Sequence, residues 1–184
     1  MEKIDANTFK KTFPSISHYM SPDELEGLLN AMKLIQVPAG EMILQDDHQN
    51  DSLYLLVQGE LSSYILHDGE KIKLGPIYPG QSVGEVSMLD AEPASATVIA
   101  ESDATLLALS RESFFDLDKR FPNVTSNILH TISKLMASRI RIGEEMLFRR
   151  FSPEQTDEES KTEIGPIEWA KRIYQKLHGH EEVH

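Results

Sequence analysis

Residues 84–98 read Gly-Glu-Val-Ser-Met-Leu-Asp-Ala-Glu-Pro-Ala-Ser-Ala-Thr-Val, and this segment organises the rest of the chain. A glycine precedes six residues that are mostly compatible with a helix, and Pro93 and small residues then lead into a β-branched run. This order predicts a short helical turn that interrupts a β-sheet. The first backbone N–H groups of such a turn lack intrahelical partners, so its start suits an anionic group. An ordinary small helix between strands, with no ligand, would leave the same pattern.

Short apolar runs separated by turn residues fill the region between residues 34 and 109. Asp68-Gly69 lies between two of these runs and is a strong signal for a two-residue β-hairpin. Seven or eight strands at this spacing predict an antiparallel β-sandwich or jelly roll. The runs are 34–37, 42–44, 53–57, 61–66, 71–74, 97–100 and 105–109.

Helical signals flank the predicted sheet on both sides. Apolar residues at loosely helical spacing predict a lead-in helix within residues 1–20. The sequence Ser-Pro-Asp-Glu at residues 21–24 is a capping-box start for a helix that reaches about residue 32. After the sheet, a short helix is predicted over residues 111–119.

The longest helical stretch is predicted over residues 123–148. Apolar residues recur there at three- and four-residue spacing and form a wide stripe. A stripe of this width has one side to bury on its own domain and another to bury on a partner. We therefore expect a homodimer through helix 123–148. The alternative is an ordinary helix that lies flat on the sheet.

The C-terminal part is predicted to contain a linker and one further helix. Residues 149–163 are expected to form an acidic linker, because most of them are polar and none provides an apolar anchor after residue 151. Residues 164–184 are expected to form a short amphipathic helix and a polar tail. The apolar face within residues 164–178 would dock on the domain, on its dimer partner or on another protein. The domain itself would occupy residues 21–148.

Length and composition limit the classes of function. The 184 residues suit one domain with a tail, and the absence of cysteine excludes disulfides, thiolate metal sites and cysteine nucleophiles. The formal net charge of −12 argues against direct nucleic-acid binding. No apolar run has the length of a signal-peptide core or a membrane span, so we expect a soluble, cytoplasmic protein with no membrane partner.

From about residue 22 to residue 142 the chain resembles a cyclic-nucleotide-binding domain. In that family the phosphate-binding cassette reads roughly Gly-Glu-(Leu/Ile)-(Ala/Ser)-Leu-Leu and then (Pro)-Arg-(Ala/Ser/Thr)-Ala-Thr-Val. Residues 84–89 and 93–98 fit these two halves. The resemblance implies a mostly β fold with flanking helices: an eight-stranded antiparallel β-roll or jelly roll, N-terminal helices and a long C-terminal dimerisation helix. It also implies a regulatory module, shared by the catabolite activator family, kinase regulatory subunits and nucleotide-gated channels.

The resemblance places the ligand-binding residues in the cassette. They are Gly84, Glu85, Val86, Ser87, Ala94, Ser95 and Ala96. In the family the glutamate, here Glu85, accepts a hydrogen bond from the ribose 2′-hydroxyl of cyclic AMP or cyclic GMP. From residue type alone, the backbone of the adjacent turn could equally satisfy Glu85, and the hydroxyls of Ser87 and Ser95 could cap backbone groups.

One position departs from the family pattern, because Ala94 stands where the family carries an arginine. That arginine supplies the cation for the cyclic phosphate. A charge-assisted hydrogen bond to phosphate is worth roughly 1.5 to 3 kcal/mol, or about 10- to 150-fold in affinity. Arg111 and Arg139 are the candidates for a replacement cation. An ordinary surface or salt-bridge role is the alternative for each.

A metal enzyme of the cupin type is the main catalytic alternative for a jelly roll. It needs a close histidine pair and a carboxylate on strands, whereas His48 and His67 lie alone in turns. The histidines within residues 178–184 could chelate a metal, but a frayed polar tail is the simpler interpretation. We therefore expect no catalytic activity, no metal and no cofactor.

Together these features predict a stand-alone regulatory domain without a DNA-binding domain. Ligand occupancy of the cassette would shift the long helix and alter a partner. Two alternatives stay open. The domain could have lost nucleotide binding and act as a dimeric protein-interaction scaffold, or it could bind a different small ligand.

Overall fold

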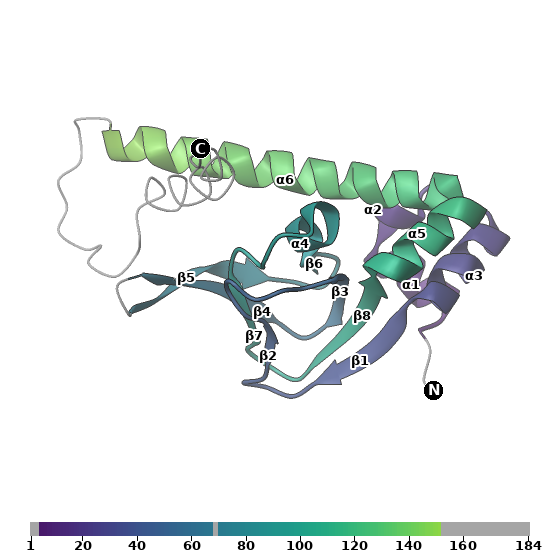
Figure 1. Ribbon diagram of the computed structural model, residues 1–184, viewed down its shortest axis with the longest axis horizontal. Helices are drawn as coiled ribbons and strands as arrows, with labels where there is room; N and C mark the ends of the chain where they lie inside the picture. Colours follow the sequence, from purple (N-terminus) through teal and green to yellow (C-terminus); the bar gives the residue numbers. More distant parts are fainter. Residues whose placement is uncertain (1–3, 68–69, 152–184) are drawn as a thin grey trace, which may run out of the picture. The chain divides into compact units, whose positions relative to one another are not determined.

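The computed structural model describes residues 4–67 and 70–151. The chain divides into two compact units, Met1–Ile132 and Ser133–His184, and each is described by itself. The helices of the described residues are α1 (Ala6–Thr12), α2 (Pro14–Ser17), α3 (Pro22–Ala31), α4 (Glu85–Asp90), α5 (Arg111–Arg120) and α6 (Pro122–Phe151) (Figure 1). The strands are β1 (Lys33–Val37), β2 (Met42–Leu44), β3 (Ser52–Gln58), β4 (Leu61–His67), β5 (Glu70–Ile77), β6 (Ser82–Val83), β7 (Thr97–Ala100) and β8 (Ala104–Ser110).

The eight strands in the described part of the chain form two four-stranded sheets. The strand order is β1-β8-β3-β6 in one sheet and β2-β7-β4-β5 in the other. Every neighbouring pair runs antiparallel. This architecture confirms the predicted eight-stranded antiparallel β-roll with flanking helices.

Side chains from both sheets meet in one hydrophobic core. Leu56 and Leu106 of the first sheet belong to the same buried cluster as Leu61 and Val98 of the second. Removal of this apolar surface from water is the main favourable term for such a fold. Ala94 of the cassette belongs to the cluster too, so the cassette is partly built into the core.

The hairpin signal at residues 68 and 69 is consistent with the strands on either side. β4 and β5 pair in antiparallel register from Leu61 opposite Ile77 to His67 opposite Glu70. The two turn residues themselves lie outside the described residues.

The N-terminal segment differs from the predicted lead-in helix. It forms two short helices, α1 and α2, with a break at Phe13, where φ is −121° and ψ is 59°. Pro14 explains the break, because a proline disfavours the helical conformation of the residue before it. The following helix, α3, begins as predicted, because Ser21 and Glu24 form a complete capping box at its N-terminus.

Four helices of the first unit, α1, α2, α3 and α5, gather at one end of the sheets, whereas α4 lies beside β3 (Figure 1). Asn127 of α6 donates to the backbone carbonyl of His18 at 3.2 Å, and Asn123 donates to Glu24 at 3.3 Å. These bonds tie the N-terminal helices to the first turns of α6.

The first turns of α6 bury one stripe in their own domain. Val124, Ile128 and Ile132 are all buried. This is the domain-facing side that the long apolar stripe predicts, and the helix extends slightly beyond the predicted range, to Pro122–Phe151. The predicted linker after residue 151 and the helix within residues 164–178 lie outside the described residues.

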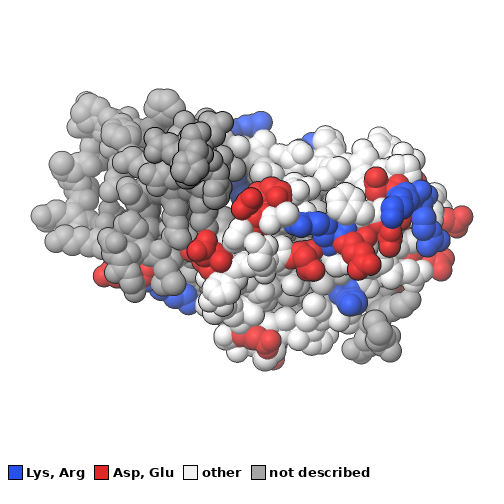
Figure 2. Space-filling view, in the orientation of Figure 1, with Lys and Arg blue, Asp and Glu red and all other residues white. Residues whose placement is uncertain are grey.

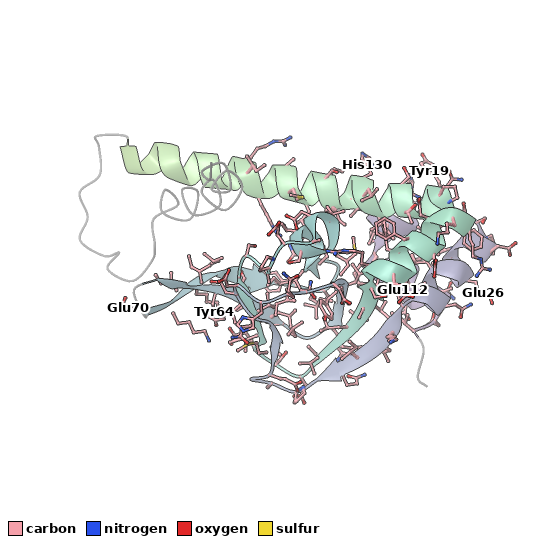
Figure 3. All side chains as sticks on the ribbon, viewed as in Figure 1. Tyr19, Glu26, Tyr64, Glu70, Glu112 and His130 are labelled. Carbon is pink, nitrogen blue, oxygen red and sulfur yellow. The ribbon has the colours of Figure 1, made fainter. Side chains whose placement is uncertain are left out.

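The surface carries interspersed charges. On the face drawn in Figure 2, Lys and Arg side chains of the described residues lie beside Asp and Glu. Tyr64 of β4, labelled in Figure 3, shows such a group: its hydroxyl donates to Glu101, and the ammonium of Lys71 lies 3.9 Å from its ring centroid. The hydrogen bond from Tyr64 is the main reason why the pKa of Glu101 is lowered to about 2.

None of the helices described has the length and apolar character needed to cross a membrane.

Candidate functional site

The cassette forms a short helix, α4, as the sequence predicts. α4 is flanked by Gly84 and Ala91, and both adopt the left-handed conformation, with φ of 80° and 66°. Gly84 also supplies space, because a Cβ there would lie 2.5 Å from the carbonyl oxygen of Ser52. The start of α4 is therefore held close against β3.

The first turn of α4 directs polar side chains into the domain. Glu85 is only 1% exposed, Ser87 is buried as well, and Val86 is half-buried. A carboxylate in such a place is costly unless other groups compensate its charge. Glu85 does interact within the chain. The residue predicted to accept the ribose hydroxyl is thus a buried carboxylate.

The second half of the cassette runs beside the loop of residues 45–51. The backbone N–H of Ala94 donates to the carbonyl of His48, and the N–H of Asp47 donates to the carbonyl of Ala94, both at 2.9 Å. The methyl group of Ala94 is 2% exposed and contributes to the core. Ser95 is half-buried, as is the neighbouring Ala96. The residue at the position of the family arginine, Ala94, is therefore surrounded by apolar side chains.

The same loop also contacts both ends of the cassette. The Nδ2 of Asn50 lies 3.5 Å from the carbonyl oxygen of Gly84, to which it donates. The backbone N–H of Asp46 donates to the hydroxyl of Thr97 at 3.0 Å. Loop 45–51 thus braces the cassette. The sequence marks these residues only as turn formers, so it gives no signal of this long-range role.

Arg111, one of the two candidate cations, binds the end of α4. Its Nε donates to the carbonyl of Met88 at 2.9 Å, and its Nη2 donates to the carbonyl of Ser87. A cation is favoured there by the partial negative charge of the last helical carbonyls. Arg139, the other candidate, lies on α6 in the second unit.

The charge of the cassette itself is negative. Residues 84–96 contain Glu85, Asp90 and Glu92, and no Lys, Arg or His. An anion placed there would depend on backbone N–H groups or on a cation from another segment. The guanidinium of Arg111 already binds two backbone carbonyls. The negative charge of the cassette therefore favours a ligand that binds through groups other than a phosphate.

A cavity of about 610 Å³ lies on the side of loop 45–51 lined by β2, Tyr54 and Arg111. Burial raises the pKa of the Tyr54 hydroxyl. None of residues 84–96 lines this cavity. The cavity nevertheless adjoins the cassette, because Asn50 and Arg111 of its lining donate to backbone carbonyls of residues 84–88.

The histidines do not assemble a metal site in the part of the chain that the structure describes. No three His, Asp or Glu side chains come together there in a way that could hold an ion. The Nδ1 of His48 is 3.0 Å from the carbonyl oxygen of Asp46. The histidines within residues 178–184 lie outside the described residues.

Comparison with known proteins agrees with this geometry. Residues 34–121 match the family model described as "Cyclic nucleotide-binding domain". The chain is 32% identical over 125 residues to the cyclic AMP receptor protein of Thermus thermophilus, which covers 67% of this chain and 56% of that protein. The matched segment is thus little more than half of the length of this relative.

Solved structures show the same fold. The crystal structure of the Thermus thermophilus catabolite activator protein matches with a TM-score of 0.63 and 30% identity, over 72% of this chain and 61% of that chain. A cyclic nucleotide-binding domain from Methylobacillus flagellatus matches with a TM-score of 0.69 and 21% identity, over 84% and 88% of the two chains. With its β-roll, its helical cassette and the sequence match, the segment of residues 34–121 belongs to the cyclic nucleotide-binding domain family.

Proposed function

We propose that this chain is a non-enzymatic, cytoplasmic regulatory domain in which a ligand at the cassette changes α6 and thereby a protein partner. The observation that carries the proposal is the buried carboxylate of Glu85, which is the first residue of α4. This carboxylate occupies the position that the family uses to recognise ribose. The proposal therefore concerns binding and regulation.

The ligand is proposed to be held mainly through a hydroxyl group at Glu85. Ala94 provides no cation for a phosphate, and residues 84–96 carry three carboxylates and no basic side chain. Without the charge-assisted bond to phosphate, we expect an affinity for cyclic AMP or cyclic GMP about 10- to 150-fold below that of a cassette with arginine.

A second candidate function is a dimeric interaction scaffold that binds no nucleotide. It is favoured by the position of Ala94, whose methyl group is part of the hydrophobic core. In that case the cassette, with α4, would have only a structural role against loop 45–51. A different small ligand at the same site is the remaining possibility.

Titration of nucleotides into the full chain separates these candidates. We expect calorimetry to show that wild-type protein binds cyclic AMP at high micromolar to millimolar concentration. The 2′-deoxy analogue of cyclic AMP should bind at least about tenfold more weakly, because the hydroxyl that would donate to Glu85 is missing. Adenosine, which has the ribose hydroxyl but no phosphate, should bind within a few-fold of cyclic AMP.

Two results would reject the ligand part of this proposal. Equal binding of cyclic AMP and its 2′-deoxy analogue would remove Glu85 from recognition. No heat of binding with any of these compounds at millimolar concentration would leave the scaffold as the leading function.

A homodimer through α6 is proposed as the state of the protein. Two apolar residues of α6 are not covered by the rest of the chain: Leu129 is 37% exposed and Ile140 is 56% exposed. Exposed apolar residues on a long helix gain free energy when a second helix covers them. Residues 164–178 are proposed as a further contact for a protein partner.

Ile140→Glu is expected to convert a dimer into a monomer, because it would place a carboxylate in the helix–helix contact. Ser138→Glu is the matched control. Its side chain is exposed and projects from another side of the helix, since neighbouring positions are 100° apart. Light scattering after size-exclusion chromatography measures both masses. A monomeric wild type, or equal loss of the dimer in both variants, would contradict the proposed interface.

A further inference from the structure

Arg111 stands where three separate segments of the first unit meet. Its side chain donates to the carbonyls of Ser87 and Met88 in α4. Its backbone N–H donates to the carbonyl of Asp51 at 2.7 Å. It is also the first residue of α5, and the adjoining Glu112 marks that start in Figure 3.

The two side-chain bonds are suited to hold α4 in one position. A guanidinium presents its N–H groups in a rigid, planar fork, so bonds from Nε and Nη2 fix both the distance and the orientation of the two carbonyls. Ser87 and Met88 are buried and Arg111 is half-buried, so these bonds are partly shielded from water. The carbonyl of Ser87 also accepts from Ala91 at the end of α4. Arg111 and α4 thus share one hydrogen-bond network.

The other end of α5 is joined just as closely to α6. The N–H of Phe121 donates to the carbonyl of Leu117 at 2.7 Å, and the N–H of Val124 donates to Phe121 at 2.9 Å. The hydroxyl of Thr125, which is buried, contacts the carboxylate of Asp118 across the corner. Hydrogen bonds therefore join α5 directly to the first turn of α6.

We propose that Arg111 is a positioning residue that couples α4 to α5 and, through the α5–α6 corner, to α6. This inference rests on the proposed regulatory function, which gives the coupling its role. The connection from Arg111 to α4 is itself a property of the ligand-free domain. It assigns Arg111 a role different from that of a phosphate-binding cation.

Amide hydrogen exchange of the ligand-free full chain tests the link. The N–H groups of Met88 and Ala91 are bonded within α4, to Gly84 and Ser87, and report its local opening. The N–H of Leu56, bonded to Gln81, reports the sheet. In Arg111→Met, exchange at Met88 and Ala91 is expected to accelerate about 10- to 100-fold more than exchange at Leu56.

Two further variants distinguish the link from general stability. Arg111→Lys keeps the charge but lacks the fork, so it should restore only part of the protection of α4. Arg120→Met removes an exposed arginine at the other end of α5 and should leave the exchange of α4 unchanged. Equal acceleration at Ala91 and Leu56 in Arg111→Met, or no acceleration at either, would overturn the inference.

A second arm with millimolar cyclic AMP separates this inference from the proposed function. Ligand is expected to slow exchange at Ala91 and at Val124 in wild type, but only at Ala91 in Arg111→Met. Slowing at Val124 in both proteins would overturn the coupling role while the regulatory function stands. If ligand changes neither amide in wild type, the proposed function fails, and the ligand-free comparison alone decides whether Arg111 links α4 to α5.

Discussion

Ala94→Arg is expected to lower the melting temperature of the ligand-free protein and to make that temperature sensitive to cyclic nucleotides. Ala94 is 2% exposed among the apolar side chains of both sheets. A guanidinium introduced here would replace a methyl group in apolar packing, and a buried charge that lacks a partner costs about 3 to 5 kcal/mol. For a domain of this size, that cost corresponds to a decrease of roughly 6 to 20 °C.

Cyclic AMP or cyclic GMP should reverse part of this loss in the variant. The cyclic phosphate would pair with the new guanidinium, and binding only to the folded state stabilises by about 2.7 kcal/mol at a concentration of 100 Kd. Scanning calorimetry with and without millimolar nucleotide measures the effect. Adenosine, which lacks the phosphate, should give a much smaller shift in the variant.

Ala94→Met separates the added volume from the charge. Methionine is long and unbranched but neutral, so it should cost about 1 to 3 kcal/mol as overpacking and show no new response to nucleotide. An equal rise of the melting temperature with cyclic AMP in wild type and in Ala94→Arg would contradict this account. It would mean that another group already supplies the cation.

The fold could be predicted from the sequence wherever the signal is local. The helix over residues 85–90 follows from a glycine, a helix-compatible run and a proline, and the capping box at Ser21 follows from four consecutive residues. The strand β6 has no such signal. Ser82 and Val83 form a strand because their backbone pairs with Tyr54 and Leu55, which are distant in sequence.

The environment of the site depends on contacts that no local pattern encodes. The position of Asn50 beside Gly84 joins residues 34 apart in the chain, and the bonds from Arg111 to α4 join residues 23 and 24 apart. Arg111 was a candidate only by residue type. The structure explains its position through the last carbonyls of α4. Which residues contact a ligand remains a prediction from the cassette motif.

Gly84→Ala is expected to destabilise the protein by about 2 to 5 kcal/mol. The backbone at Gly84 has a φ of 80°, which costs a residue with a Cβ roughly 1 to 2 kcal/mol. The new Cβ would also lie 2.5 Å from the carbonyl oxygen of Ser52 and 2.8 Å from the Nδ2 of Asn50. Because one of these atoms belongs to the backbone of β3, α4 must shift, which adds about 1 to 3 kcal/mol.

Gly40→Ala isolates the contribution of the backbone conformation. Gly40 has a similar φ of 86°, but a Cβ there would meet no atom within 4 Å. Its substitution should cost only the roughly 1 to 2 kcal/mol of the left-handed conformation. Urea unfolding of both variants gives the two losses. Equal losses would show that the close contact between α4 and β3 contributes nothing, whereas a larger loss at Gly84 would show that the cassette is held in place by its approach to β3.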